Sequence, residues 1–128
     1  MSSDQRKVLI MDDSEIALYF GREALEKGGF DVRTASNLAE FDAALLDWHP
    51  DVILTDVAMP EIDGGELCRT LKSRLEGKDV PVLLFSAMSE AQLERVAREC
   101  GADGYLTKMN GLERLPEQLH ALCEEIVW

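Results

Sequence analysis

The stretch from residue 51 to residue 64 reads Asp51-Val52-Ile53-Leu54-Thr55-Asp56-Val57-Ala58-Met59-Pro60-Glu61-Ile62-Asp63-Gly64. Its apolar run has the length of a strand and stops abruptly at the acid Asp56. Ligands of open α/β sheets bind in the crevice outside the carboxyl ends of the strands. Asp56 is therefore predicted to be the reactive residue of the chain.

Four more segments of strand length flank this stretch, at residues 7–11, 31–35, 81–85 and 104–107, and the first of them is a continuous apolar run. Helical patterns separate them and begin at Glu15, after Asn37, at Gly64, after Ser89 and near Leu115. The first helix carries a wide apolar stripe that is predicted to be buried: Ala17, Leu18, Phe20, Gly21, Ala24 and Leu25.

Five strands that alternate with five helices imply a parallel sheet with helices on both faces, joined by right-handed crossovers. The predicted fold class is α/β: a doubly wound, five-stranded parallel sheet in a three-layer αβα arrangement. The 128 residues fit one domain, predicted to span residues 1–128 with a core from about 6 to 127.

Composition and charge narrow the range of functions. The chain is 46% hydrophobic and 30% charged, as is typical of globular proteins, and its formal net charge is −12. Phosphate contacts need clustered Lys and Arg, so direct binding to nucleic acid is not expected. Neither a signal peptide nor an apolar run long enough to cross a membrane is found. Cys68, Cys100 and Cys123 show the pattern of reduced, buried thiols. A cytoplasmic location is expected.

The residues that end the strands carry the chemical information. The first strand ends in Asp12 and Asp13, the third in Asp56, the fourth in Ser86 and the fifth in Lys108. Parallel strands end at the same edge of a sheet, so three carboxylates, a hydroxyl and an ammonium are expected to converge on one cleft.

Charge then indicates what such a cleft binds. Three neighbouring carboxylates repel one another, so the site requires a cation, and ligands that are all oxygen favour Mg²⁺. Lys108 cannot bind the metal, but it can neutralise a second negative group beside the Ser86 hydroxyl. A phosphoryl group fits this pattern, and a carboxylate can act as its nucleophile.

In these residues the chain resembles the receiver domain of two-component response regulators, of the chemotaxis-regulator type. The matching pieces are Asp12-Asp13, Asp56 with Met59-Pro60 and Asp63-Gly64, Ser86-Ala87, Gly101-Ala102 and Lys108. The resemblance implies the strand order 2-1-3-4-5, which doubly wound proteins of this type share.

The resemblance also implies a role for each residue. Asp56 would accept a phosphoryl group from a sensor histidine kinase or a small phosphodonor. Asp13, Asp56 and the backbone carbonyl of Ala58 would bind Mg²⁺ directly, and Asp12 would act mainly through metal-bound water. Ser86 and Lys108 would contact the phosphoryl group.

Tyr105 matches the aromatic switch position of the family. Phosphorylation would draw Ser86 toward the new oxygens and let the Tyr105 ring turn, which shifts the surface formed by the fourth helix, the fifth strand and the fifth helix. That surface would control a downstream protein, and the chain is expected to be a monomer or a weak dimer through it. A simple packing role for Tyr105 stays open.

Two further features concern the rates and the departure from the family pattern. Ala58 and Met88 occupy positions that resemble the family's rate-tuning sites; both are apolar, which predicts moderately slow self-dephosphorylation.

Met109 stands where the family usually has proline, so we expect a trans bond or a rearranged loop after Lys108. Pro116 lies unusually far into the last helical segment, so we expect that helix to start late.

Two alternatives remain. A pseudo-receiver would use the same fold as an interaction module without phosphorylation, and the Met109 departure keeps it open. A small phosphatase with an Asp nucleophile would need D-x-D at the first strand end and a cap domain, and here Asp12 and Asp13 are adjacent. The sequence ends where the last helix of a receiver ends, so no output domain is expected within it. The expected function is a switch rather than a turnover enzyme.

Overall fold

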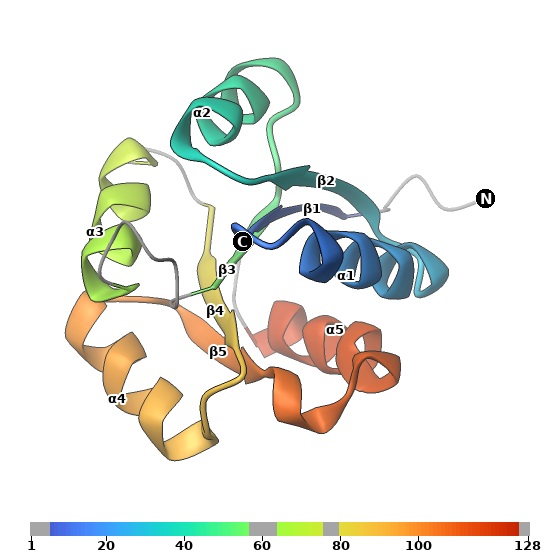
Figure 1. Cartoon of the computed structure of the whole chain (residues 1–128), viewed down its shortest axis with the longest axis vertical. Coiled ribbons are helices and arrows are strands. Elements are labelled where there is room, and N and C mark those ends of the chain that lie inside the picture. The colour runs from blue at the N-terminus through green and yellow to red at the C-terminus, as the bar shows by residue number, and fades with distance from the viewer. Residues whose placement is uncertain (1–5, 57–63, 76–79, 126–128) are drawn as a thin grey trace.

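The computed structural model describes residues 6–56, 64–75 and 80–125. Five parallel strands form one sheet in the order β2-β1-β3-β4-β5 (Figure 1). The strands are β1 (Lys7–Met11), β2 (Asp31–Ala35), β3 (Val52–Thr55), β4 (Val82–Ser86) and β5 (Gly104–Thr107). The predicted fold class and strand order are confirmed, and the predicted boundary of the fourth strand is displaced by one residue.

Five helices connect or follow the strands, and polar residues fix several of their ends. They are α1 (Glu15–Lys27), α2 (Leu38–Asp47), α3 (Gly64–Arg74), α4 (Glu90–Cys100) and α5 (Leu115–Glu125). Ser89 and Gln92 form the predicted capping box of α4. Gly101 ends this helix with a φ of 80°, a conformation that glycine adopts without steric strain.

Alternating strand residues build a separate core on each face of the sheet. Leu9, Ile53 and Leu84 belong to one cluster, and Ile10, Leu54 and Leu83 belong to the other. The helices α2, α3 and α4 cover the first face of the sheet, and α1 and α5 cover the second (Figure 1). Because side chains along a strand point to opposite faces, a strand buried on both faces appears as a continuous apolar run. This explains why β1, β3 and β4 could be recognised in the sequence as apolar runs.

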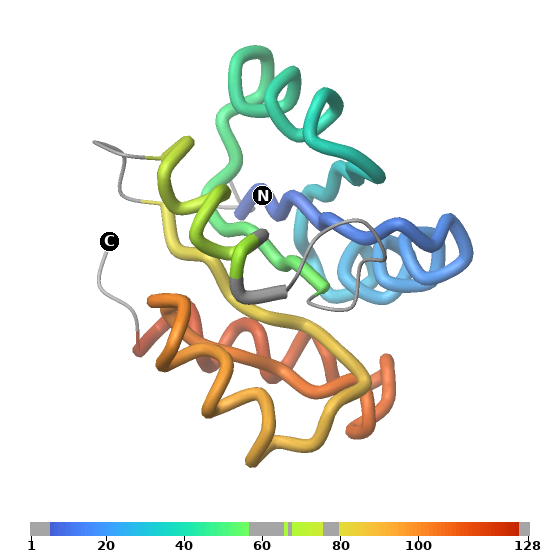
Figure 2. Tube along the Cα trace, turned by 60° about the vertical axis from the view of Figure 1, so that its left-hand side comes forward, coloured from blue at the N-terminus to red at the C-terminus, as the bar shows by residue number. Residues whose placement is uncertain are grey.

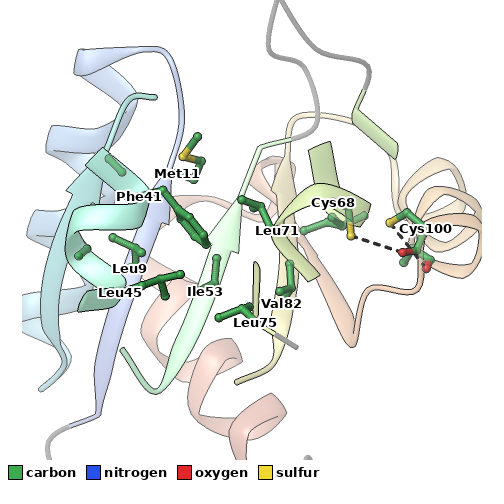
Figure 3. Close-up of a cluster of buried hydrophobic side chains, with 14 of the residues drawn as sticks. Leu9, Met11, Phe41, Leu45, Ile53, Cys68, Leu71, Leu75, Val82 and Cys100 are labelled. Carbon is green, nitrogen blue, oxygen red and sulfur yellow. Dashed lines mark hydrogen bonds between the residues drawn. The ribbon is translucent and has the colours of Figure 1, made fainter. Parts of the chain in front are cut away.

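The three cysteines are free and buried, as predicted. Cys68 of α3 points toward Cys100 of α4, and its thiol donates a hydrogen bond to the Cys100 carbonyl oxygen at 3.8 Å (Figure 3). Burial raises the pKa of the Cys68 and Cys123 thiols, which keeps them protonated and poorly nucleophilic. The cysteines therefore serve as packing residues between helices and sheet.

The buried stripe predicted for α1 is wrong at one position. Leu18, Gly21 and Leu25 are buried and Ala17 and Ala24 are half-buried, but Phe20 is 50% exposed. The periodicity included Phe20 because the apolar residues of α1 span more of the helix surface than the sheet covers. Ile16 and Tyr19 are exposed beside it.

The connection from β5 to α5 is rearranged, as the sequence predicted. All peptide bonds of the described residues are trans, and two 3₁₀ turns, Lys108–Asn110 and Leu112–Arg114, precede α5. Pro116 lies at the second position of the helix and packs tightly against Gly28, where a Cβ atom would clash with the proline ring. Within the described part of the chain, no helix has the length and apolar character needed to cross a membrane.

Candidate functional site

One backbone hydrogen bond continues the sheet beyond the end of β1 and another beyond the end of β3, and these two bonds fix the positions of Asp12 and Asp56. The Asp12 N–H donates to the Ala35 carbonyl at 3.1 Å, and the Asp56 N–H donates to the Met11 carbonyl at 3.0 Å. Both carboxylates therefore lie at the carboxyl edge of neighbouring strands. The connections after β4 and β5 leave the sheet at the same edge (Figure 2).

Lys108 joins the two acids. Its Nζ lies 2.9 Å from Asp12 Oδ2 and 3.3 Å from Asp56 Oδ2, although these acids precede it by 96 and 52 residues. The side chains are largely shielded from water, with 5% exposure for Asp12, 12% for Asp56 and 24% for Lys108. Partial burial strengthens such charge pairs because water screens them less.

The surroundings of Lys108 hold the ammonium in its charged form. Burial alone would lower the pKa of Lys108, but the hydrogen bond to Asp12 and the charges of Asp56 and Asp12 outweigh it, so the pKa is raised. The ammonium also lies 5.2 Å from the centre of the Phe85 ring, within the range of a cation–π contact. A positive charge is therefore fixed beside Asp56.

Asp12 is held from both sides, whereas Asp13 points outward. Asp12 Oδ1 accepts a hydrogen bond from the Ser14 N–H at 3.0 Å, and the Ser14 hydroxyl in turn accepts from Ala17 N–H as the N-cap of α1. Asp13 is exposed at this edge. The start of α1 thus orients Asp12 and leaves Asp13 accessible.

Ser86 ends β4 and is 2% exposed. Its hydroxyl oxygen lies 3.5 Å from the Met88 N–H, and its backbone lies opposite Thr107 in the β4–β5 register. Met88 and Tyr105 are both half-buried and pack against the core cluster on the side of α3 and α4. Their switch and rate-tuning roles stay predictions, and Ala58 lies outside the described residues.

The donor set suits Mg²⁺, but this arrangement does not bring the three acids together. Asp12, Asp13 and Asp56 offer oxygen ligands alone, as that ion prefers. Among the described residues, however, no group of three acidic, histidine or cysteine side chains is close enough to hold a metal. The ammonium of Lys108 takes a position between Asp12 and Asp56, and Asp13 is exposed. Of the three carboxylates predicted to converge, two, those of Asp12 and Asp56, lie together, and that of Asp13 is exposed.

Two residues that the sequence predictions left out contact this site. Phe85 lies beneath the Lys108 ammonium, and the buried Thr107 hydroxyl bonds both to the Met88 carbonyl and to the Met109 N–H. In the sequence, Phe85 is one more apolar residue of the fourth strand, so nothing there indicated a contact with Lys108. A hydroxyl next to Lys108 at the end of an apolar strand was a possible signal for Thr107.

Comparisons with known proteins identify a family for the chain. Residues 8–120 match the family described as the response regulator receiver domain. The chain is 34% identical over 113 residues to Protein PilG of Pseudomonas aeruginosa, covering 88% of this chain and 84% of PilG. It is 31% identical over 115 residues to the polar-differentiation response regulator DivK of Brucella ovis, covering 89% and 93% of the two chains.

Other relatives are longer. The chain is 36% identical over 117 residues to the response regulator MprA of a Mycobacterium species, covering 91% of this chain and about half, 50%, of MprA. Among solved structures, the chemotaxis protein CheY4 of Vibrio cholerae superimposes with a TM-score of 0.78 at 28% identity, covering 92% of this chain and 98% of CheY4. The family match, these relatives and the shared fold lead to one conclusion: this chain belongs to the response regulator receiver domain family.

Proposed function

We propose that the chain is a phosphorylation-activated signalling switch with Asp56 as its phospho-acceptor. Receiver domains are generally signalling switches rather than enzymes, and they act between histidine kinases and downstream proteins. The observation that carries the proposal is the Lys108 ammonium, held at 2.9 and 3.3 Å from the carboxylates of Asp12 and Asp56 at the carboxyl edge of the sheet.

The chemistry follows from these positions. A carboxylate oxygen of Asp56 would attack the phosphorus of a phosphohistidine or a small phosphodonor. The bond from phosphorus to the donor breaks, and the donor leaves with its electron pair and takes up a proton. Lys108 would stay near Asp56 and neutralise the transferred group, and the Ser86 hydroxyl would donate to one of its oxygens.

A magnesium ion would be held by Asp12, Asp13, Asp56 and, as the family resemblance implies, the carbonyl of Ala58. When bound, it would offset negative charge that accumulates on the phosphoryl oxygens. The exposed position of Asp13 leaves its carboxylate accessible to an ion entering from solvent. Lys108 would then yield part of its contact with Asp56.

The output follows from added charge at one strand end. Phosphorylation adds about 1.5 to 2 negative charges. Attraction of Ser86 toward them would let Tyr105 turn and would bias the surface of α4, β5 and α5 between two states. A shift from 1:99 to 99:1 needs roughly 5.5 kcal/mol of differential interaction, so a partial shift is expected. The partner would read this surface, through which the chain would also form any weak dimer.

A protein donor must approach the edge that holds Asp56, and the surface there suits protein contact. Ile16, Tyr19 and Phe20 lie on one exposed face at the beginning of α1. Phe20 also lines, with Leu112, a pocket of about 580 Å³ that extends along α1 as far as Gly28. Clusters of exposed apolar side chains commonly mark contact sites. A histidine kinase in the cytoplasm is the proposed donor.

The test uses a small phosphodonor, Mg²⁺ and intact-mass measurement. One phosphoryl addition is expected to the wild-type chain and none to Asp56→Asn. Asp31→Asn is the matched control, because Asp31 is an exposed acid at the start of β2, at the other edge of the sheet, and it should be phosphorylated like wild type. No addition to the wild-type chain would favour the pseudo-receiver instead.

A further inference from the structure

Thr107 is a buried hydroxyl residue that ends β5, one position before Lys108, and it is 5% exposed. Its Oγ1 donates a hydrogen bond to the Met88 carbonyl oxygen at 2.7 Å and accepts one from the Met109 N–H at 3.1 Å. A hydroxyl carries one proton, so the donor and acceptor roles are both in use. The rotamer of Thr107 is thereby fixed by two backbone groups from different loops.

These two bonds connect the loops that carry Ser86 and Lys108. Met88 follows Ser86 by two residues, and its N–H lies 3.5 Å from the Ser86 hydroxyl. The Met109 N–H belongs to the peptide that directly follows Lys108. A continuous path therefore runs from the Ser86 hydroxyl, through Met88 and the Thr107 side chain, to the peptide bond of Lys108.

We propose that Thr107 is a positioning residue that couples the Ser86 loop to Lys108. The proposal rests on the proposed function of Asp56 and deepens it. When Ser86 moves toward a phosphoryl oxygen, the Met88 backbone moves with it. The hydroxyl of Thr107 then carries that displacement to the Lys108–Met109 peptide, so that Ser86 and Lys108 reach the phosphoryl group together.

The departure from the family pattern makes this path possible. Proline has no backbone N–H, so a proline at position 109 could not donate to Thr107. Met109 supplies that N–H, and Thr107 acts as the N-cap of the 3₁₀ turn that begins at Lys108. The alternative role of Thr107 is to satisfy two backbone groups without any effect on the site.

Two substitutions separate these roles. Thr107→Val keeps the shape of the side chain but removes the hydroxyl, and Thr107→Ser keeps the hydroxyl. We expect the rate constant of Asp56 phosphorylation by a small phosphodonor to fall roughly tenfold in Thr107→Val, because small misplacements of positioning groups reduce rates strongly. Thr107→Ser should restore most of the rate.

Methyl NMR of ¹³C-labelled methionine supplies a readout that a purely structural role would not change. Beryllium fluoride with Mg²⁺ stands in for the phosphoryl group on Asp56. In the wild-type chain the Met88 and Met109 methyl signals should both shift. In Thr107→Val the Met88 shift should persist and the Met109 shift should diminish. Met109→Pro removes the other end of the link and should lower the phosphorylation rate as Thr107→Val does, with Met109→Leu as its control.

The outcomes are distinguishable. If Thr107→Val melts at a lower temperature but is phosphorylated at the wild-type rate, with both methyl shifts intact, the coupling is refuted and the proposed function stands. If the wild-type chain takes no phosphoryl group, both proposals fall. Should Thr107→Val not fold, the phosphorylation rates of Met109→Pro and Met109→Leu decide: a lower rate in Met109→Pro alone supports the coupling, and equal rates refute it.

Discussion

Lys108 is the residue on which the site depends, since it carries the positive charge between two partly buried acids. Removing one partner of such a pair leaves the other charges shielded from water and unpaired, which costs more than the pair itself contributes. In the unphosphorylated chain its ammonium contacts Asp12 and Asp56. The same ammonium can then balance the charge of a phosphoryl group without a large movement.

The raised pKa of Lys108 predicts how stability depends on pH. A lysine in the unfolded chain loses its proton near pH 10.4, and the folded chain holds that proton to higher pH because the pKa of Lys108 is raised. The contribution of Lys108 to the free energy of unfolding, about 1–3 kcal/mol, is fully present below that pH and is lost as pH rises through the folded pKa.

Urea unfolding of the wild type and of Lys108→Met from pH 8 to about pH 11 tests this dependence. The difference in unfolding free energy should be constant at the lower values and should shrink at the upper ones. Taking the difference cancels the ionisation of tyrosine and cysteine, which both chains share. A difference that stays level or grows across the alkaline range would refute the prediction.

Met88 predicts the lifetime of the phosphorylated state. Its side chain is apolar and half-buried against the core, so it cannot orient a water molecule toward the phosphoryl group. Met88→Asn should accelerate loss of phosphate by roughly three- to tenfold, less than the roughly 100-fold or more of a positioned general base.

The measurement is the decay of the phosphorylated chain after the donor is removed. Met109→Asn is the matched control, because Met109 is 70% exposed and does not occupy the position two residues after Ser86. Equal decay rates for Met88→Asn and wild type would contradict the predicted role.

Among the elements, the connection between β5 and α5 contains the departure from the family pattern, Met109. The two 3₁₀ turns delay the start of α5 to Leu115, and the contact of Pro116 with Gly28 fixes the helix against the end of α1. The sequence indicated a changed loop here because Met109 replaces proline. It could not indicate that Thr107 would hold the loop, since that bond depends on the distance between two loops.

Met109→Pro should therefore destabilise the chain although proline is the usual residue of the family. It removes the N–H that donates to Thr107, and the residue before a proline is disfavoured in helical conformations, which affects Lys108 in the 3₁₀ turn. We expect a loss of about 1–3 kcal/mol in the free energy of unfolding by urea titration.

Met109→Leu keeps the N–H and a similar side chain, so its stability should stay within about 0.5 kcal/mol of wild type, as for ordinary surface changes. If Met109→Pro were as stable as Met109→Leu, the bond to Thr107 would not support the turn.

Elements were predictable where one periodicity dominated. β1, β3 and β4 appear in the sequence as apolar runs because both faces of the sheet are covered where these strands lie. Phe20 was misplaced because the periodicity of a helix indicates an apolar face without showing how far the neighbouring sheet extends. The contacts of Lys108 likewise depend on tertiary distances, so the sequence showed that it would reach the site but not which carboxylates it would bind.

On the scale of the whole molecule, the sheet order decides what meets at the site. With β1 between β2 and β3, and β3 beside β4, the ends of β1 and β3 are adjacent, so Asp12 and Asp56 lie side by side. Alternation of strands and helices predicted a parallel sheet, but the order came from the family resemblance. Length and composition could not supply it, because several orders satisfy the same alternation.

The net charge of −12 gives Mg²⁺ two ways to stabilise the folded chain: general screening of repulsion and coordination by the site. MgCl₂ should therefore raise the midpoint of thermal unfolding more than NaCl of equal ionic strength. At a concentration about ten times the dissociation constant, coordination contributes roughly 1.4 kcal/mol, which corresponds to several degrees for a domain of this size.

Asp13→Asn separates the two effects, because Asp13 is exposed and its replacement leaves both cores intact. The excess effect of MgCl₂ should disappear in this variant, and the effect of NaCl should remain. Lys108→Met should enlarge the excess, since the metal no longer competes with the ammonium for Asp56. Equal midpoints in MgCl₂ and NaCl for the wild type would show that Mg²⁺ acts on this molecule through screening alone, and an excess that survives Asp13→Asn would show that Asp13 does not hold the ion.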